Sequence, residues 1–300
     1  MVNIFNKMVV MTMPLVPKPV VGFFSRKYIA GDSLDDGIKV VKELNSRNIK
    51  ATMDVLGEDI SEISEAYASR DQYLETLERI RDEKVDANVS IKLSQMGLRI
   101  DRQKCIEIMT EIVKKAQEYG NFVRIDMEDV TATDDTLHVY RALKEKFTNV
   151  GVVLQAYLRR TINDINSLWG QGLNFRLCKG IYIEKRQFAY KQMRIINESF
   201  AYNLRKMFEA NAYVGIATHD EYIVFKALSI IDEMKIPKTM YEFQMLLGVD
   251  EELRDIIVNS GHNLRVYVPY GKQWYAYSMR RLKENPAVAG HIIKDILRFK

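Results

Sequence analysis

The regular alternation of short β-branched runs with longer helical runs constrains the fold of this chain more than any other feature. From Ile49 onward each apolar run precedes a run with helical periodicity: Ile60–Glu83, Arg102–Tyr119, Glu184–Ala210 and Glu221–Met234 are examples. This order is typical of βαβ units and a parallel sheet. The count predicts eight strand–helix units, which is the number that closes a (β/α)8 barrel, an α/β fold. The predicted strands are Ile49–Val55, Asn88–Leu93, Phe122–Asp126, Val150–Ala156, Asn174–Cys178, Tyr213–Ala217, Thr239–Phe243 and Leu264–Val268.

The length suits one large barrel as a single domain. The chain has 300 residues, of which 47% are hydrophobic and 28% charged, and no repeat or linker divides it. We expect a catalytic barrel over residues 49–300, preceded by an N-terminal helical segment over 1–48 that packs on it. Within that segment Ser33 is placed to cap a helix whose apolar stripe includes Leu34, Ile38, Val41 and Leu44.

Composition also limits the partners and the compartment. The net charge is +4 and the basic residues are dispersed, so nothing indicates nucleic acid, while anionic lipid is favoured only weakly. Met8–Phe24 is apolar, but three prolines and a lysine make it a poor membrane span or signal. We expect it to pack on the barrel, a membrane-contacting arm being the alternative, and expect a cytoplasmic chain. Cys105 and Cys178 have no metal or redox spacing and could form at most one disulfide.

The stretch His262–Pro286 combines a strand, a turn and a helix around one loop. The strand Leu264–Val268 is expected to stop at Pro269, and the helical pattern runs from Lys272 until Pro286. Within about ten residues of this stretch lie three tyrosines and a tryptophan, which is unusual for a plain solvated face.

Adjacent Arg280 and Arg281 lie on that predicted helix, about 100° apart around its axis. Both can flank one site, and a guanidinium fork matches a carboxylate. The alternative is that Arg280 pairs with Glu284 one turn later on a solvated face.

Barrel enzymes carry their active sites at the C-terminal ends of the strands, and every predicted strand places a polar group there. Lys92 is notable because it interrupts an apolar run. The polar groups at these ends are Asp54, Lys92, Ser94, Asp126, Glu128, Gln155, Tyr157, Arg176, Lys179, Thr218, His219, Glu242, Gln244 and Tyr267.

The sequence lacks the motifs of several other enzyme classes. It has no Gly-x-Gly-x-x-Gly after a strand, no P-loop, no His-Glu-x-x-His and no Gly-x-Ser-x-Gly. If a dinucleotide binds, we expect it in the barrel mouth.

Tyr-Val-Pro-Tyr-Gly at 267–271, followed by Tyr-Ser-Met-Arg-Arg-Leu-Lys-Glu-Asn-Pro at 277–286, closely resembles the C-terminal signature of the proline dehydrogenase family, in its monofunctional bacterial form. Further segments resemble that family's motifs in the expected order, so the resemblance spans roughly Lys50 to Asn285. These segments are Leu-Gly-Glu at 56–58, Ser-Ile-Lys-Leu-Ser at 90–94, Ile-Asp-Met-Glu at 125–128, Gln-Ala-Tyr at 155–157, Arg-Leu-Cys-Lys-Gly-Ile-Tyr at 176–182, Ala-Thr-His at 217–219 and Tyr-Glu-Phe-Gln-Met-Leu at 241–246.

The resemblance implies oxidation of L-proline to Δ1-pyrroline-5-carboxylate, the first step of proline catabolism, with hydride transfer to FAD. Electrons would pass to a membrane quinone during transient membrane contact. Lys92, Arg280 and Arg281 would hold the substrate carboxylate, while Tyr267 and Tyr277 would wall its ring. In addition, Leu246 would lie near the substrate and Glu58 would pair with Arg280 as a gate.

The resemblance also implies a set of FAD contacts, and no metal. The flavin-binding residues would be Asp126, Gln155, Arg176, Lys179, Gly180, Tyr182, Thr218 and His219. A cation near the flavin N1–N5 edge stabilises the anionic reduced ring, which suits Arg176. Two positions depart from the family: Cys178 replaces an aliphatic residue, and Asp220 replaces an amide.

Structural explanations remain open for these residues. Lys92 could snorkel from the barrel mouth or pair with Asp126, and Arg176 and Lys179 could pair with the acids of the third strand. Similarly, His219 could be a rim residue and Leu246 a core residue.

Two other functions remain open. The first is a lyase or aldolase that uses Lys92 as a Schiff base. The second is a binding protein for small carboxylates that catalyses no turnover.

Overall fold

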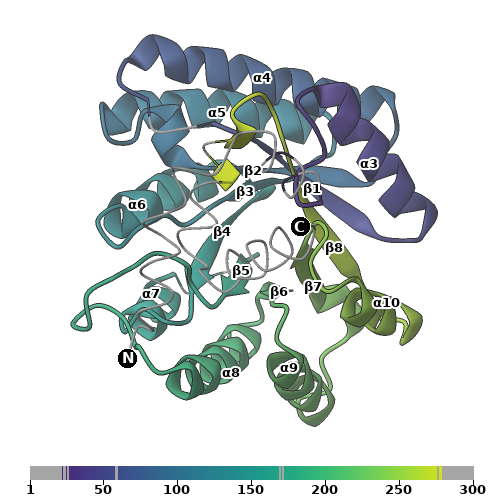
Figure 1. Ribbon diagram of the computed structural model, residues 1–300. Helices are drawn as coiled ribbons and strands as arrows, with labels where there is room; N and C mark the ends of the chain where they lie inside the picture. The colour runs from purple at the N-terminus through teal and green to yellow at the C-terminus, as the bar shows by residue number, and fades with distance from the viewer. Residues whose placement is uncertain are drawn as a thin grey trace, which may run out of the picture.

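The protein is described by a computed structural model in residues 22, 25, 27–57, 60–168, 170, 172–275 and 277–278. Eight parallel strands close into a barrel in which each strand pairs with the next and β8 pairs with β1 (Figure 1). The strands are β1 (Lys50–Val55), β2 (Ala87–Ile91), β3 (Val123–Ile125), β4 (Val150–Gln155), β5 (Asn174–Cys178), β6 (Tyr213–Ala217), β7 (Tyr241–Leu246) and β8 (Leu264–Tyr270). The (β/α)8 barrel predicted from the sequence is confirmed.

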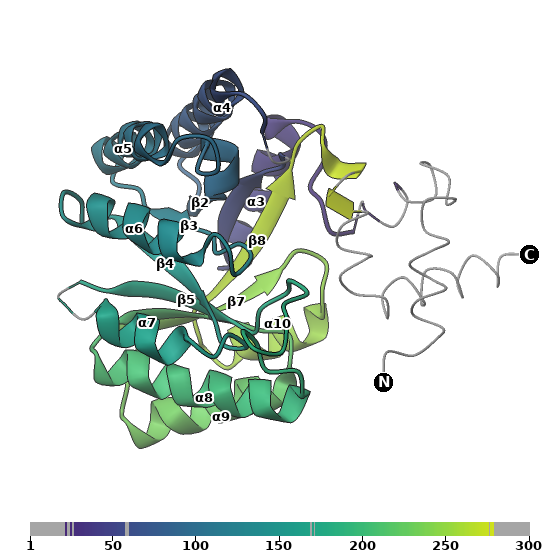
Figure 2. The ribbon, with the colours of Figure 1, turned by 90° about the vertical axis from the view of Figure 1, so that its left-hand side faces the viewer.

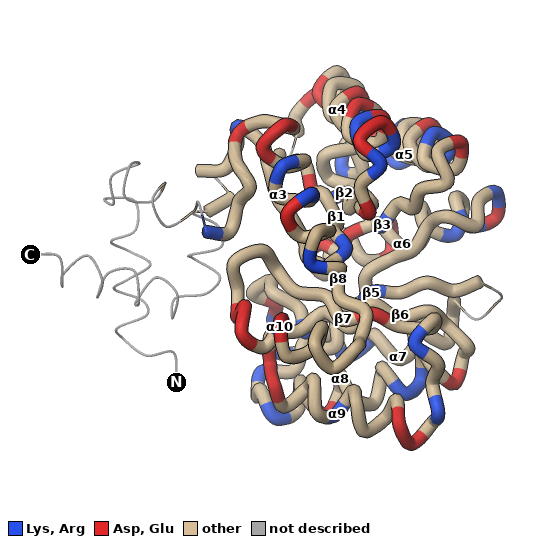
Figure 3. Tube along the Cα trace, turned by 90° about the vertical axis from the view of Figure 1, so that its right-hand side faces the viewer, with Lys and Arg blue, Asp and Glu red and all other residues tan. Residues whose placement is uncertain are grey.

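Helices surround the barrel, as the view turned by 90° also shows (Figure 2). They are α3 (Leu34–Ser46), α4 (Ile63–Asp82), α5 (Arg102–Glu118), α6 (Thr133–Lys144), α7 (Thr161–Ser167), α8 (Met193–Glu209), α9 (Glu221–Glu233) and α10 (Glu251–Asn259), with short 3₁₀ turns at Leu93–Met96 and Lys238–Met240. Acidic and basic segments alternate along these outer helices (Figure 3), and pairs such as Arg70–Glu111 join neighbouring ones.

Helix α3 precedes the first strand and packs against β1 and β8, where the barrel closes. Its start is fixed by a capping box: the Ser33 hydroxyl accepts from the Asp36 N–H, and the Asp36 carboxylate accepts from the Ser33 N–H at 3.0 Å. Ile38, Val41 and Leu44 form its buried face, as the stripe predicted.

The strands bury both faces, but the face inside the barrel is strongly polar. Most barrels fill this space with branched apolar side chains. Here Arg124 and Arg176 occupy it, on β3 and β5. Gly151 and Gly215 make room for large neighbours. A Cβ at Gly151 would overlap the Arg124 guanidinium and lie 2.5 Å from the Asn174 carbonyl oxygen, and one at Gly215 would overlap the Gln244 amide.

Several predicted boundaries were wrong. Pro269 does not end β8, which continues to Tyr270. The strand continues past Pro269 because β1 pairs with β8 as far as Tyr270, whereas β7 pairs with it only as far as Tyr267. The Pro269 carbonyl accepts from the Ala30 N–H at 2.9 Å. Strand β7 starts at Tyr241 rather than Thr239 because residues 238–240 form a 3₁₀ turn, and it extends to Leu246. The helix expected from Glu184 begins at Met193, since the preceding loop bridges back to Leu158 through Ala189. The other predicted ends coincide with the observed ones or differ from them by at most three residues.

Three further points from the sequence concern a possible disulfide, membrane-spanning helices and the apolar N-terminal stretch. Cys105 and Cys178 are not joined by a disulfide. In the part of the chain that the structure describes, no helix has the length and apolar character needed to cross a membrane. Nearly all of Met8–Phe24 lies outside the described residues, so its expected packing stays a prediction.

Candidate active site

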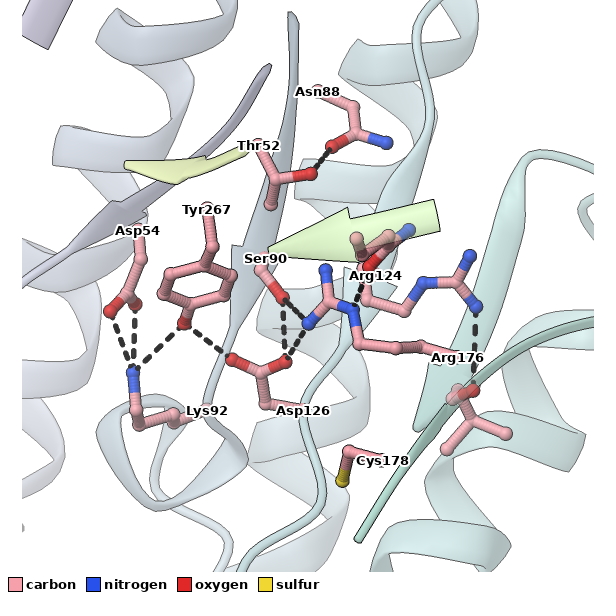
Figure 4. Close-up of polar contacts among 12 residues, drawn as sticks. Thr52, Asp54, Asn88, Ser90, Lys92, Arg124, Asp126, Arg176, Cys178 and Tyr267 are labelled. Atoms are coloured by element: carbon pink, nitrogen blue, oxygen red, sulfur yellow. Dashed lines mark hydrogen bonds and ion pairs between the residues drawn. The ribbon is translucent and has the colours of Figure 1, made fainter. Parts of the chain in front are cut away.

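The C-terminal ends of β1, β2, β3, β5 and β8 bring one connected polar cluster together inside the barrel mouth (Figure 4). Four residues expected from the sequence belong to it: Lys92, Asp126, Arg176 and Tyr267. The structure also brings in Asp54 and Gln244, which the sequence placed at strand ends without a role, and Ser90, which it did not single out.

Asp126 is the centre of the cluster. One carboxylate oxygen accepts from Ser90 Oγ at 2.6 Å and from Arg176 Nη1 at 2.7 Å, and the other accepts from the Tyr267 hydroxyl at 2.8 Å. Burial acts to raise the pKa of Asp126, but the charges of Arg176 and Lys92 outweigh it and hold this pKa below its usual value. Asp126 is therefore ionised at neutral pH and acts as an acceptor.

Lys92 directs its ammonium group at Asp54 rather than at Asp126. Its Nζ lies 2.8 and 2.9 Å from the two Asp54 carboxylate oxygens and 3.5 Å from the Tyr267 hydroxyl. Thus the pairing with Asp126 considered from the sequence was wrong, although Asp126 contributes to the local field. Burial acts to lower the pKa of Lys92, but Asp54 and Asp126 reverse this and raise it. A protonated lysine is a poor Schiff-base nucleophile, so this arrangement disfavours the aldolase hypothesis.

Tyr267 joins the two halves of the cluster. Its hydroxyl donates to Asp126, and the Arg176 guanidinium carbon lies 5.3 Å from its ring centroid. Burial and the charges of Asp126 and Asp54 raise the pKa of Tyr267 well above its ordinary value, so the phenol keeps its proton. Tyr277 is buried with Ile29 and Leu56, and it contributes to the electrostatics of both Tyr267 and Lys92. It therefore lies beside the cluster.

Leu246 lies at the end of β7, opposite Tyr267 in the sheet register and half-buried. His219 is fixed beside it, because its Nε2 accepts from the Leu246 N–H at 3.1 Å. An accepting Nε2 places the proton of neutral imidazole on Nδ1. The two residues are thus coupled through the β6 and β7 ends.

Lys179 forms a second centre at the end of β5. Its Nζ lies 2.6 Å from Asp220 Oδ2, so it pairs with the start of α9 and not with the acids after β3. Arg176, by contrast, does pair with Asp126, as its structural alternative proposed. The Thr218 hydroxyl accepts from the Asp220 N–H at 3.0 Å. Gly180 has φ +106°, and a Cβ there would collide with the Tyr157 ring, so this turn requires glycine.

Gln155 ends β4 almost fully buried, and its Oε1 accepts no hydrogen bond from the described part of the chain. Buried acceptors are rarely left unsatisfied, so such an atom indicates a missing donor.

Tyr182 is half-buried two residues after Gly180. Glu58, Arg280 and Arg281 lie outside the described residues, so their predicted positions stay predictions.

Ser90 was not singled out from the sequence and Asp54 was noted only as a polar strand end, yet both carry a detectable signal. Asp54 and Ser90 are polar residues within apolar strand runs, the same feature that singled out Lys92. Asp54 is fully buried and holds Lys92 with both oxygens. A count of polar residues inside each strand, rather than at its end, would have found both.

A closed parallel barrel with ionised groups gathered at its mouth is the architecture of a TIM-barrel enzyme. The comparisons with known proteins make this specific. A family model described as proline dehydrogenase matches residues 37–294. The chain belongs to the proline dehydrogenase family and is an oxidoreductase of that family.

Curated relatives agree over most of their length. The chain is 34% identical over 274 residues to proline dehydrogenase 1 of Bacillus subtilis subsp. natto, covering 91% of each chain. It is also 34% identical over 279 residues to the proline dehydrogenase of Deinococcus radiodurans, covering 91% of this chain and 90% of that one.

A solved structure supports the fold. Proline utilization A from Bdellovibrio bacteriovorus, inactivated by N-propargylglycine, superposes with a TM-score of 0.80 at 24% identity. The match covers 87% of this chain but only 32% of that longer protein.

Proposed function

We propose that this protein oxidises L-proline to Δ1-pyrroline-5-carboxylate, the first step of proline catabolism, with FAD as hydride acceptor. The observation that carries the proposal is the buried Asp126–Arg176–Tyr267–Lys92 cluster at the mouth of a barrel of this family. FAD performs the oxidation when bound, and the side chains bind and orient. The working domain division is a catalytic barrel over 49–300 with residues 1–48 packed on it, which the contacts of α3 with β1 and β8 support.

The mouth residues fit a flavin. The open Gln155 Oε1 suits the N–H of a pyrimidine ring, and Arg176 supplies a cation whose charge Asp126 only partly offsets. Lys179 suits the diphosphate, with Gly180, Tyr182, Thr218 and His219 around it. In that role its ammonium would be shared between the diphosphate and Asp220.

The substrate carboxylate would be held by Lys92, Arg280 and Arg281. Because both oxygens of Asp54 already balance the charge of Lys92, the arginine pair would supply most of the excess positive charge. Tyr267, Tyr277 and Leu246 would wall the ring.

No strong general base is required if proline reacts as its neutral amine. Asp126, although ionised, is saturated by three donors and is better suited to orienting Tyr267 and Arg176 than to taking a proton.

Glu58 would pair with Arg280 and gate access to the mouth. The preceding Gly57 packs against the 3₁₀ turn after β2, where a Cβ would lie 2.7 Å from Gln95 Nε2, so the loop that carries Glu58 starts beside the barrel mouth.

We also propose a membrane quinone as electron acceptor, reached by transient contact with an anionic lipid surface. Of the ten large apolar side chains exposed in the described residues, five lie between Ile181 and Ile195, and Ile183 is 87% exposed. Four exposed bases share this segment: Lys185, Arg186, Lys191 and Arg194. Apolar side chains among bases are typical of surfaces that bind anionic membranes.

Vesicle co-sedimentation tests this contact. The double variant Phe188→Ser/Ile195→Ser should bind vesicles of anionic phospholipid less than the parent, whereas Ile256→Ser, on α10, should not. If the parent and both variants bind the vesicles equally, residues 181–195 are not the membrane contact. Reduction of a short-chain quinone by proline-treated protein tests the acceptor.

A visible spectrum before and after anaerobic L-proline tests the main proposal. A yellow protein that bleaches supports it. A colourless protein that cannot be reconstituted with FAD contradicts it and would favour a lyase or aldolase that uses Lys92 as a Schiff base. Proline binding without bleaching would indicate a carboxylate-binding protein.

A further inference from the structure

The charges inside the barrel do not balance. Three buried bases each have a carboxylate partner: Lys92 with Asp54 at 2.8 Å, Arg176 with Asp126 at 2.7 Å, and Arg265 with Glu242 at 2.7 Å. A fourth, Arg124, is 2% exposed. Among the residues that the structure describes, it forms no ion pair, so these four bases meet three carboxylates and leave one excess positive charge. Glu128, which is buried after β3, accepts from the Ser94 N–H at 2.9 Å instead.

Only neutral acceptors hold the Arg124 guanidinium. Its Nη1 donates to the Asn174 carbonyl oxygen at 2.8 Å and to the Val152 carbonyl oxygen at 3.3 Å, and its Nη2 donates to the Asn174 side chain. Phe122 packs its ring 4.9 Å from the guanidinium carbon, and Gly151 leaves room for it. Burial, followed by repulsion from Arg176, lowers the pKa of Arg124 to about 9, which leaves it charged at neutral pH. The Glu242 carboxylate, although paired with Arg265, opposes this lowering without forming an ion pair with Arg124.

The position of Arg124 places this charge next to the active-site cluster. In the sheet register Arg124 lies opposite Ser90, whose hydroxyl bridges Asp126 and Arg176. In Figure 4 its guanidinium points away from Asp126 and from the Arg176 guanidinium, although the charge of Arg176 acts on it. The electric field of Arg124 therefore adds to that of Arg176, and Asp126, which pairs with Arg176, does not cancel it.

We propose that Arg124 is a positioning residue for the redox reaction: its uncompensated charge, acting beside Arg176, raises the reduction potential of the flavin in the barrel mouth. This inference rests on the proposed function, because it requires bound FAD. A fixed cation in a water-poor interior stabilises the extra negative charge of reduced flavin. The structural alternative is that Arg124 only joins β3 to β4 and β5.

Asn174→Asp separates the two explanations without removing Arg124. The substitution is close in size and places a carboxylate on the same guanidinium nitrogen, so it neutralises the charge while keeping the contact. We expect about a tenfold fall in the ratio of reduced to oxidised flavin at a given ambient potential, a shift of about 30 mV for a two-electron couple. Thermal stability should be unchanged or higher.

Two further variants complete the test. Asn174→Ala removes the side-chain acceptor but leaves the charge, so its flavin potential should equal that of the parent even if stability falls. Arg124→Gln removes the charge and should lower the potential as Asn174→Asp does. Potentials are measured by equilibrating each flavin-bound protein with reference dyes.

An unchanged potential in a folded, flavin-bound Asn174→Asp variant would overturn the inference, as would an equal shift in Asn174→Ala. If the parent binds no FAD, the proposed function fails instead, so the two failures are distinguishable.

Discussion

Replacing Asp126 by asparagine tests whether the cluster is held by a buried charge. The side chain of Asp126 is 12% exposed and that of its partner Arg176 is 8% exposed, and the carboxylate accepts three hydrogen bonds. Removing one partner of a buried ion pair costs about 3–5 kcal/mol. Asparagine retains an acceptor oxygen, so we expect the lower end, about 3 kcal/mol, or a fall in Tm of about 5 °C.

The pH dependence of this loss follows from the lowered pKa of Asp126. A carboxyl group whose pKa is lower in the folded protein contributes stability above its unfolded pKa, about 3.9, and loses it as the pH falls through the folded value. The difference in unfolding free energy between the parent and Asp126→Asn should therefore be complete at pH 7 and shrink below about pH 4.

Asp134→Asn is the matched control. Asp134 also pairs with an arginine, Arg160, but its side chain is 83% exposed, and exposed pairs contribute about 0–1 kcal/mol. Thermal unfolding followed by circular dichroism at pH 7 and pH 3.5 measures both variants. The reasoning is refuted if Asp126→Asn costs no more than Asp134→Asn, or if its cost is the same at both pH values.

Three further predictions use other residues. Gly151→Ala should destabilise the barrel by about 1–3 kcal/mol because its Cβ would overlap Arg124, whereas Gly170→Ala, with open space around it, should change the Tm little; equal shifts would exclude the overlap. Arg281→Met should lower kcat/KM for proline about 10- to 100-fold but barely change oxidation of a cyclic amine without a carboxylate, and equal losses for both substrates would make Arg281 structural. Glu58→Ala should alter the kinetics of substrate binding and release with little change in Tm, so a large fall in Tm with unaltered kinetics would count against a gate.

The pattern of apolar residues within short windows of the sequence was sufficient to predict the strands and most helices. Strands β5 and β6 have the predicted bounds, since their apolar runs begin and end sharply. The errors arose where a local signal was overridden: Pro269 remains in β8 because β1 pairs with this strand as far as Tyr270. A contact with a residue more than two hundred positions away leaves no trace in a short window.

The site was predicted in its residue types but not in its pairings. Lys92, Asp126, Arg176 and Tyr267 stood out as polar groups at strand ends and meet as expected. However, which carboxylate pairs with which base depends on the strand register and on the barrel's shear.

The sequence by itself determined that parallel strands would close a barrel and bring these polar ends to one mouth, because periodicity and chain order are local properties. Only the tertiary structure decided that Lys92 pairs with Asp54 and that, within the residues the structure describes, Gln155 keeps an open acceptor and Arg124 has no carboxylate partner. Charge balance in a buried space depends on distances of a few ångströms across the barrel, and these exist only once all eight strands have met.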